Sequence, residues 1–401
     1  METRNVVIVD AVRSPLGRAK KGSLIHTRID DLAVHVLKAL LARTKVDPGT
    51  IEDVGVGCAF PEAEQGMNIA RHLVLLADLP HSIAGQTTNR FCGSSMETLH
   101  SLARAIAVGD ADVAVSIGLE HMTHVPMGGF KPMDAFNPGL MERQALWPMP
   151  QTAQNLAEQY GISREEMDRF AAQSHRRAAA ATDSGRFHAE IVPIEVPVSD
   201  ASFAPTAQRK VFERDECIRP DTTVETLAVL EPIKGMPPLF SMKDGPLLIT
   251  AGNSCPINDG AAAILLMEAK RAEKLGYAPL ARIHSMAVAG VDPKIMGIGP
   301  VPSSKKALAR AGIEAKDLDL VEINEAFAGQ VLACNRDLEI PEEKLNVNGG
   351  AVALGHPLGC SGTRLLVTLT HEMKKRGAKR GLATMCIGGG QGIATVVERV
   401  S

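Results

Sequence analysis

Apolar positions follow two different periods along the chain, and their alternation predicts an α/β fold. Short β-rich runs at 6–9, 54–58 and 113–117 are typical of strands. Apolar residues at helical spacing predict helices over 31–43 and 96–106. Because strands that alternate with helices usually form one covered sheet, the pattern favours a parallel sheet with helices on its faces.

The last third of the chain repeats this scheme. Helices are expected over 305–311 and 362–375, and strands at 318–323, 382–386 and 393–397. In each half a cysteine with small neighbours opens a helix that leads to an apolar strand ending in glycine. The matching triplets are Cys92-Gly93-Ser94 and Cys360-Ser361-Gly362. The shared order of features predicts two halves related by duplication.

Residues 122–247 interrupt the pattern. They are rich in Pro, Met and charged residues, and they contain one helical pair, over 151–160 and 164–182. The stretch 198–210 shows no periodicity, so we expect no regular structure there. Long excursions of this kind usually form lids or binding loops, which predicts an insertion packed over the first half.

Composition narrows the classes of function. The 401 residues carry 43 basic and 46 acidic side chains, for a net charge of −3, and only 3% are aromatic. This balance argues against nucleic acid or an anionic membrane as the main partner. No run of 18 apolar residues predicts a membrane span, and no signal peptide is evident. Seven scattered cysteines without a CxxC pair favour reduced thiols and a cytoplasmic location.

Cys92 is the first candidate for chemistry. It lies in Asn89-Arg90-Phe91-Cys92-Gly93-Ser94-Ser95-Met96, where small residues suit a tight turn into a helix. A helix N-terminus favours the thiolate, so we expect the pKa of this thiol to lie below its usual value of about 8.5. A buried structural cysteine is the alternative.

His356 is the second candidate, because four glycines and a proline surround it in 348–360. Glycine permits sharp turns and close approach of a ligand. Histidine is suited to take a proton from a thiol at neutral pH. A metal held by His356 and Cys360 would need a second ligand pair that the sequence lacks, so no metal is expected.

Two further segments present polar groups at strand ends. Cys386 precedes the run Ile387-Gly388-Gly389-Gly390, which predicts either a plain hairpin or a loop whose N–H groups bind an oxyanion. Asn324 directly follows a strand, where ligands bind in α/β sheets, although it is equally suited to cap a helix. His121 and His124 form an HxxH pair that we interpret as loop structure.

Taken together and in this order, the motifs resemble those of the thiolase family over essentially the whole chain. The resemblance rests on segments 89–96, 324–327, 355–362 and 386–390. It implies a duplicated α/β fold in five layers, αβαβα, with a loop domain inserted in the first half. The halves would comprise 1–121 with 248–275, and 276–401. Residues 122–247 would cover the active site and bind coenzyme A (CoA).

The resemblance also implies catalytic roles. Cys92 would be the nucleophile that accepts the acyl group, His356 its base, and Cys386 a second acid/base. Asn324 would hold a water that, with His356, stabilises an enolate oxygen. The N–H groups of Cys92 and Gly388 would form an oxyanion hole for the tetrahedral intermediate.

CoA contacts follow from the same resemblance. Arg219 would contact the nucleotide end, and Met149 and Phe327 would line the pantetheine path. Cys255 stands where the family has a pantetheine-binding serine, and Pro256 follows it, so CoA binding here departs from the family pattern. CoA would be a co-substrate, with no permanently bound cofactor and no metal.

Among thiolases, the chain most resembles the bacterial 3-ketoacyl-CoA thiolases of fatty-acid β-oxidation. These cleave a 3-ketoacyl-CoA with CoA by ping-pong acyl transfer. The alternatives are a biosynthetic acetyl-CoA C-acetyltransferase and a non-catalytic acyl-CoA carrier. A homodimer or homotetramer is implied, and some members also bind a multifunctional β-oxidation subunit.

Overall fold

One twisted sheet of ten strands organises the chain. The computed structural model describes residues 3–132, 134, 137–143, 145, 147–236, 240–241 and 247–400. Nine strands follow one another across the sheet in the order β12-β13-β14-β11-β1-β10-β5-β3-β4, and β2 (Gly17–Arg18) pairs beside β10. The nine strands, in chain order, are β1 (Val6–Arg13), β3 (Asp53–Gly57), β4 (Ala84–Thr88), β5 (Val113–His121), β10 (Asn258–Glu268), β11 (Ala281–Gly290), β12 (Leu320–Ile323), β13 (Arg380–Ile387) and β14 (Gln391–Glu398).

The sheet is mixed, so the prediction of a parallel sheet holds for only three of the nine strand pairings described in it. Strand β3 runs parallel to β4 and β5, and β12 runs parallel to β13. In contrast, β10 is antiparallel to both of its long neighbours, and β14 is antiparallel to both β13 and β11. Only two residue pairs join β1 to β11, so the sheet consists of two halves connected by a short seam.

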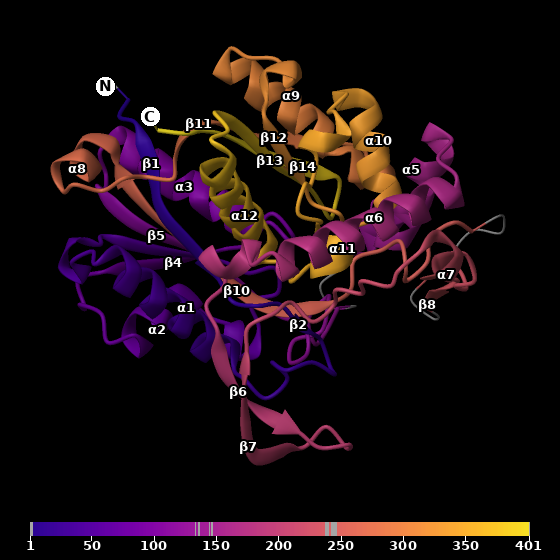
Figure 1. Ribbon diagram of the computed structural model, residues 1–401, viewed down its shortest axis with the longest axis horizontal. Coiled ribbons are helices and arrows are strands. Elements are labelled where there is room, and N and C mark those ends of the chain that lie inside the picture. The colour runs from indigo at the N-terminus through magenta and orange to yellow at the C-terminus, as the bar shows by residue number, and fades with distance from the viewer. Residues whose placement is uncertain are drawn as a thin grey trace.

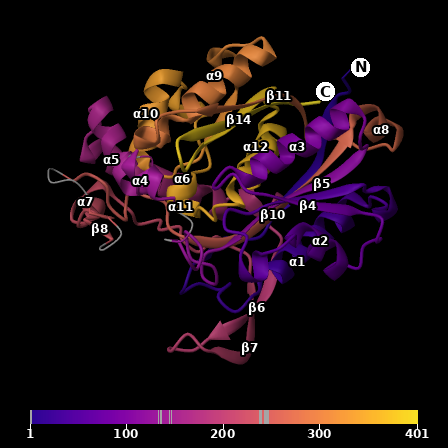
Figure 2. The ribbon, with the colours of Figure 1, turned by 180° about the vertical axis from the view of Figure 1, so that it is seen from behind.

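Helices form three layers around these two half-sheets (Figure 1; Figure 2). The outer face of the first half packs against α1 (Ile29–Thr44) and α2 (Ile69–Leu76). The outer face of the second half packs against α9 (Pro300–Ala311) and α10 (Ala328–Leu338). Between the halves lie α3 (Ser94–Val108) and α12 (Ser361–Arg376), whose side chains share one apolar cluster with strands of both halves. The layers therefore follow the order αβαβα.

The central helices approach each other closely because small residues line their contact. A side chain at Gly362 would collide with the backbone of Met96, and one at Gly118 would collide with Ser95. Each strand between layers sends alternate residues to opposite faces, as in β5, where Val115 enters the outer cluster and Ala114 the central one. This double burial explains the continuous apolar runs in the sequence.

The two halves repeat the same order of elements. In the first half β1, α1, β3, α2, β4, α3, β5 and β10 follow one another, and in the second β11, α9, β12, α10, α12, β13 and β14 do so. The second half lacks a full counterpart of β4. At that place a single parallel bridge joins Leu345 to Val321 of β12. The duplicated pattern in the sequence thus corresponds to a duplicated topology.

The segment between β5 and β10 covers one end of the central layer. The helix of residues Met149–Tyr160 (α5) and that of Arg164–Asp183 (α6) agree with the predicted helical pair. Strands β6 (Ile194–Ser199) and β7 (Pro205–Phe212) form a hairpin that projects from the body (Figure 1). The expectation of irregular structure over 198–210 is therefore wrong. Most of β7 is exposed, and with no buried face it has no apolar alternation to detect.

Besides short 3-10 helices, the described part of the chain contains six further short elements. They are α4 (Pro138–Glu142), α7 (Val224–Ala228), β8 (Gly235–Met236), β9 (Phe240–Ser241), α8 (Ala269–Lys274) and α11 (Ala351–Leu354).

Candidate active site

Cys92 lies in a tight turn between the edge strand β4 and the central helix α3. The preceding residue, Phe91, adopts a left-handed φ of 45°, which redirects the chain into the helix. Ser94 holds this turn, since its Oγ accepts from the Arg90 N–H at 2.9 Å and donates to the Phe91 carbonyl at 2.5 Å. The helix begins at Ser94 with Gly93 as its N-cap, so Cys92 lies just outside the helix.

The pKa of the Cys92 thiol is raised, contrary to the expectation from its place near a helix N-terminus. Burial raises its pKa to about 11, and the charge of Glu120 acts in the same direction. The backbone N–H groups of Gly388 and of Cys92 itself oppose this rise without overcoming it. Two N–H donors thus point at the sulfur, and part of the side chain remains accessible to solvent.

His356 presents one defined nitrogen as a base. Its Nδ1 lies 2.5 Å from Ser361 Oγ, which itself donates to the Pro357 carbonyl at 2.8 Å. Because that hydroxyl has a single proton, it must accept from His356, so Nδ1 carries the hydrogen and Nε2 is the free base. Burial lowers the pKa of His356 to about 3, with a further contribution from the charge of Arg364.

Asn324 lies beside this free nitrogen. Its Nδ2 donates to His356 Nε2 at 3.3 Å, and its backbone N–H donates to Thr384 in β13 at 3.0 Å. Its Oδ1 is buried and has no hydrogen-bond partner among the described residues. Since α10 begins at Ala328 with Phe327 as N-cap, Asn324 is not a helix cap, and that alternative is wrong.

Cys386 is buried near the end of β13, at the start of a glycine hairpin. The turn to β14 passes through Gly389 and Gly390, with φ of 78° and 80°, a region that favours glycine. Burial raises the pKa of Cys386, and a negative charge on Cys92 would raise it further. The two thiols are therefore close enough to interact electrostatically.

Three of the four predicted CoA contacts lie around these groups. Met149 at the start of α5 and Phe91 flank Gly388, because a side chain there would lie 3.9 Å from each. Phe327 is buried and bridges to Ser254, while the Cys255 N–H donates to the Ala326 carbonyl at 3.1 Å. Burial raises the pKa of Cys255, as does the charge of Cys92.

Arg219 lies away from the thiols, in the exposed loop before α7. Its backbone N–H donates to Nδ1 of the buried His175 at 3.2 Å. The structure thus places the Gly388 N–H against the Cys92 thiol, Cys386 within reach of the charge of Cys92, and Asn324 against His356, whereas Arg219 is exposed.

Two buried residues that the sequence analysis missed hold the loops of the site together. Glu120, at the end of β5, accepts from the N–H groups of Ala59 at 2.7 Å and Gly359 at 2.8 Å. Asn258 accepts from the His356 N–H at 3.1 Å. A carboxylate and an amide inside otherwise apolar strands were the available signals, because buried polar groups require partners.

The interpretation of the HxxH pair as loop structure is right for His124 but wrong for His121, which is the last, buried residue of β5. The rings of His121 and His124 stack with centroids 3.9 Å apart, and His124 Nδ1 lies 3.0 Å from Glu64 Oε1. Both Nε2 atoms lie within 3.2 Å of backbone carbonyls, those of Leu24 and Ile25. Glu64, His121 and His124 each bring a potential ligand atom within 4.8 Å of the others, and His121 Nδ1 already accepts from the His124 N–H at 3.2 Å.

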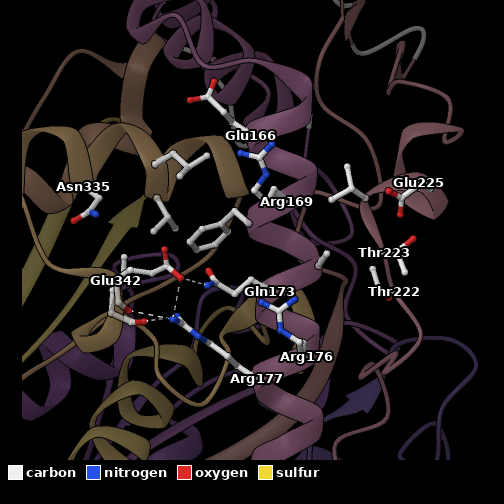
Figure 3. Close-up of a pocket in the computed structure, with 16 residues that line it drawn as sticks. Glu166, Arg169, Gln173, Arg176, Arg177, Thr222, Thr223, Glu225, Asn335 and Glu342 are labelled. Carbon is white, nitrogen blue, oxygen red and sulfur yellow. Dashed lines mark hydrogen bonds and ion pairs between the residues drawn. The ribbon is translucent and has the colours of Figure 1, made fainter.

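A surface cavity of about 590 Å³ lies apart from the thiols, between α6, α7 and α10. Figure 3 shows Arg169 and Arg176 on α6 facing this space, with Thr223 and Glu225 across from them. Glu342 closes one end by bonding to Gln173 and pairing with Arg177. None of the predicted catalytic residues lines the cavity.

The whole chain matches known protein families. Residues 6–270 match the model of the thiolase N-terminal domain, and residues 277–399 match that of the thiolase C-terminal domain. The 3-ketoacyl-CoA thiolase of Klebsiella pneumoniae is 52% identical over 401 residues, covering 98% of this chain and 99% of that protein. That of Aeromonas salmonicida is 51% identical, covering 99% and 100%.

Solved structures agree with these sequence matches. Human mitochondrial 3-ketoacyl-CoA thiolase superposes with a TM-score of 0.88 at 38% identity over the full length of both chains. Its complex with CoA gives 0.87 at 39% identity, covering 99% of this chain and 98% of that one. The acetyl-CoA acetyltransferase of Bacillus anthracis gives 0.86 at 39% identity over both full chains. The chain belongs to the thiolase family of acyltransferases.

Proposed function

We propose that the chain cleaves 3-ketoacyl-CoA with CoA, yielding acetyl-CoA and a shortened acyl-CoA, in fatty-acid β-oxidation. The observation that carries this proposal is the pairing of a partly accessible Cys92 with the Gly388 N–H, close to a second thiol on the same hairpin. A nucleophilic thiol, oxyanion donors and a second acid/base are the groups that thioester acyl transfer requires.

In the first half-reaction, Cys92 attacks the 3-keto carbon as His356 Nε2 takes its proton. Both groups are neutral at rest, so the transfer occurs as the S–C bond forms. The N–H groups of Cys92 and Gly388 stabilise the resulting oxyanion. The C2–C3 bond then breaks, leaving an acyl group on Cys92 and the enolate of acetyl-CoA, to which Cys386 gives its proton.

In the second half-reaction, the Cys386 thiolate takes the proton of an incoming CoA thiol. The CoA sulfur attacks the acyl carbon, the bond to Cys92 breaks, and protonated His356 returns a proton to that sulfur. The enzyme is then unchanged. Asn324 contributes at the enolate, because its unpartnered Oδ1 accepts from a water that donates to the enolate oxygen.

CoA would approach from the inserted segment. Met149 beside Gly388, and Phe327 beside Cys255, suit the apolar stem of pantetheine. The exposed guanidinium of Arg219 suits a nucleotide phosphate. This placement supports the division into two halves and a loop domain over 122–247, and the human relative in complex with CoA supports CoA as the co-substrate.

A biosynthetic acetyl-CoA C-acetyltransferase is the second candidate function. The Bacillus anthracis acetyl-CoA acetyltransferase matches this chain almost as well in structure as the human 3-ketoacyl-CoA thiolase does. Both activities use the same acyl-transfer chemistry, so pocket length rather than the thiols distinguishes them.

The experiment is CoA-dependent cleavage of 3-ketoacyl-CoA esters from about four to about sixteen carbons, followed by loss of the ketoacyl absorbance. A kcat/KM that holds or rises with chain length supports the degradative role. Cleavage confined to acetoacetyl-CoA favours the acetyltransferase. Binding without cleavage at any length would indicate an acyl-CoA carrier and contradict the proposal.

A homodimer is the assembly that the sheet supports best. Strand β4 is an open edge of the sheet, and Met67, Leu75 and Leu76 expose apolar surface on the neighbouring segment. Pairing of two β4 edges would cover both the open edge and this apolar surface. Two such dimers could then form a homotetramer, or a dimer could bind a multifunctional β-oxidation subunit.

Within the described ranges no helix has the length and apolarity to cross a bilayer. We propose a cytoplasmic location, because the seven cysteines are scattered and form no CxxC pair, as is typical of reduced thiols. Size-exclusion chromatography with light scattering tests the assembly, and a monomer would contradict it.

A further inference from the structure

To act on Cys92, the Gly388 N–H must keep a fixed direction, although it lies in a glycine run that allows many backbone conformations. Three consecutive glycines, Gly388 to Gly390, connect β13 to β14. Glycine loses more conformational freedom than any other residue when it is held in one conformation. An N–H that faces Cys92 therefore needs restraint from outside the turn.

A chain of side chains supplies this restraint from the opposite half of the molecule. Arg90 Nη1 donates to Gln391 Oε1 at 3.1 Å, although the two residues lie 301 positions apart. Gln391 Nε2 in turn donates to the Gly388 carbonyl at 3.5 Å. On its other side, Arg90 Nε lies 3.3 Å from Glu97 Oε2 in the first turn of α3.

Both peptide units of Gly388 are thereby constrained. The backbone pairing of Ile387 with Gln391 fixes the unit that carries the Gly388 N–H. The side chain of Gln391 holds the unit that carries the Gly388 carbonyl. Arg90 fixes the Gln391 amide, because Oε1 accepts from Arg90 and so directs Nε2 toward Gly388.

We propose that Arg90 and Gln391 are positioning residues that set the direction of the Gly388 N–H toward Cys92. Arg90 is suited to this, since it lies two residues before Cys92 in the same turn and is anchored on the helix that follows. One planar guanidinium thus links the turn of the nucleophile to the hairpin of the oxyanion donor. The inference rests on the proposed function, in which that donor serves acyl transfer.

The test uses two substitutions at Gln391 and one matched control. Gln391→Ala removes the whole link, whereas Gln391→Glu keeps an acceptor for Arg90 but cannot donate to the Gly388 carbonyl. Arg104→Ala is the control, because the half-exposed Arg104 pairs with the same carboxylate at 3.0 Å, but through Oε1 rather than the Oε2 that faces Arg90. Arg90→Lys keeps the positive charge but loses the planar guanidinium, whose N–H groups face Gln391 and Glu97 together.

Two readouts separate positioning from general destabilisation. The first is kcat/KM for 3-ketoacyl-CoA cleavage, which we expect to fall about tenfold in both Gln391 variants, less than the 10²–10³-fold typical of deleting an oxyanion donor. The second is the pH profile of Cys92 alkylation by iodoacetamide, which should shift to higher pH as the N–H moves away from sulfur. Thermal unfolding of each variant confirms that the fold is retained.

The result expected is a shifted alkylation profile in both Gln391 variants and a smaller shift in Arg90→Lys, with Arg104→Ala unchanged. Profiles that coincide with the wild type in all variants would overturn the proposal. An equal shift in Arg104→Ala would also overturn it, because the effect would then be general. Alkylation does not depend on turnover, so a protein that fails to cleave 3-ketoacyl-CoA still tests this inference.

Discussion

Each half of the molecule places a cysteine near the start of a central helix, but of these two only Cys92 is partly accessible to solvent. Cys92 precedes α3, and Cys360 precedes α12, each next to small residues. Cys360 is fully buried, and burial raises its pKa to about 12. Cys92 is partly accessible and faces the Gly388 N–H.

The difference shows that a helix N-terminus does not by itself make a reactive thiol. Near both helix starts burial outweighs any helix-dipole effect and raises the pKa of the thiol. What distinguishes Cys92 is the glycine hairpin of the other half, whose Gly388 N–H faces the sulfur. Duplication thus provides two equivalent cysteines, and the contacts between the halves select one.

The largest expected difference in kcat comes from replacing Cys92 and Cys360 with alanine, one at a time. Cys92→Ala should lower kcat by at least about 10⁴-fold, because no nucleophile remains for acyl transfer. Cys360→Ala should leave kcat within about twofold of wild type and lower the free energy of unfolding by about 1–2 kcal/mol through the cavity it leaves. Steady-state cleavage and urea unfolding measure both. Comparable losses of kcat in the two variants would contradict the view that only Cys92 serves as the nucleophile.

Cys386→Ala tests whether the second thiol, at the start of the hairpin that faces Cys92, acts as an acid/base. We expect kcat to fall by about 10²–10⁴-fold, since proton transfer to the enolate and from CoA both lose their group. Single-turnover acylation and CoA-dependent deacylation should both slow. Cys334→Ala, which removes another buried thiol from α10, is the matched control. Unchanged rates in Cys386→Ala would exclude its acid/base role.

The pH dependence of alkylation sharpens the comparison further. Because the pKa of Cys92 is raised, its thiolate fraction should grow about tenfold per pH unit from about pH 7 to pH 9, without a plateau. Since the pKa of His356 lies near 3, no inflection is expected near the usual pKa of histidine. Peptide mapping after iodoacetamide treatment measures each cysteine separately. A plateau below pH 8 at Cys92 would show an ionised thiol.

The smallest effect is expected at the hydroxyl that orients His356. Ser361→Ala removes the acceptor of the Nδ1 hydrogen, so the ring loses its fixed tautomer, and kcat should fall about fivefold with KM unchanged. Thr370→Ala is the control, because that hydroxyl on the same helix bonds only to the helix backbone. If the two variants behave alike, Ser361 has no part in orienting the base.

Local sequence patterns predicted most helices and strands, because an element with a buried face has apolar residues at regular spacing. The helical stripe of 96–106 and the strand of 113–117 lie within α3 and β5. Strand direction was not predictable, since a run such as β10 is equally apolar in a parallel and in an antiparallel pairing. The hairpin of β6 and β7 was missed because β7 is exposed along nearly its whole length and so carries no buried period.

The candidate site shows the same limit. The motifs marked segments of which two pairs interact in the structure: Asn324 with His356, and Cys386 with Cys92. The catalytic roles of these residues stay predictions. The protonation of Cys92 was predicted wrongly, since burial is a property of the packed halves. The link between Arg90 and Gln391 could not be seen, because nothing local connects residues 301 positions apart.

The most direct test of the account is to map the acyl group on the wild-type enzyme. Incubation with a 3-ketoacyl-CoA in the absence of CoA should trap the first intermediate, and mass spectrometry of the peptides locates it. The account predicts one acyl adduct, on the peptide of Cys92, and an unmodified Cys360. An adduct on Cys360, Cys386 or Cys255, or none on Cys92, would contradict it.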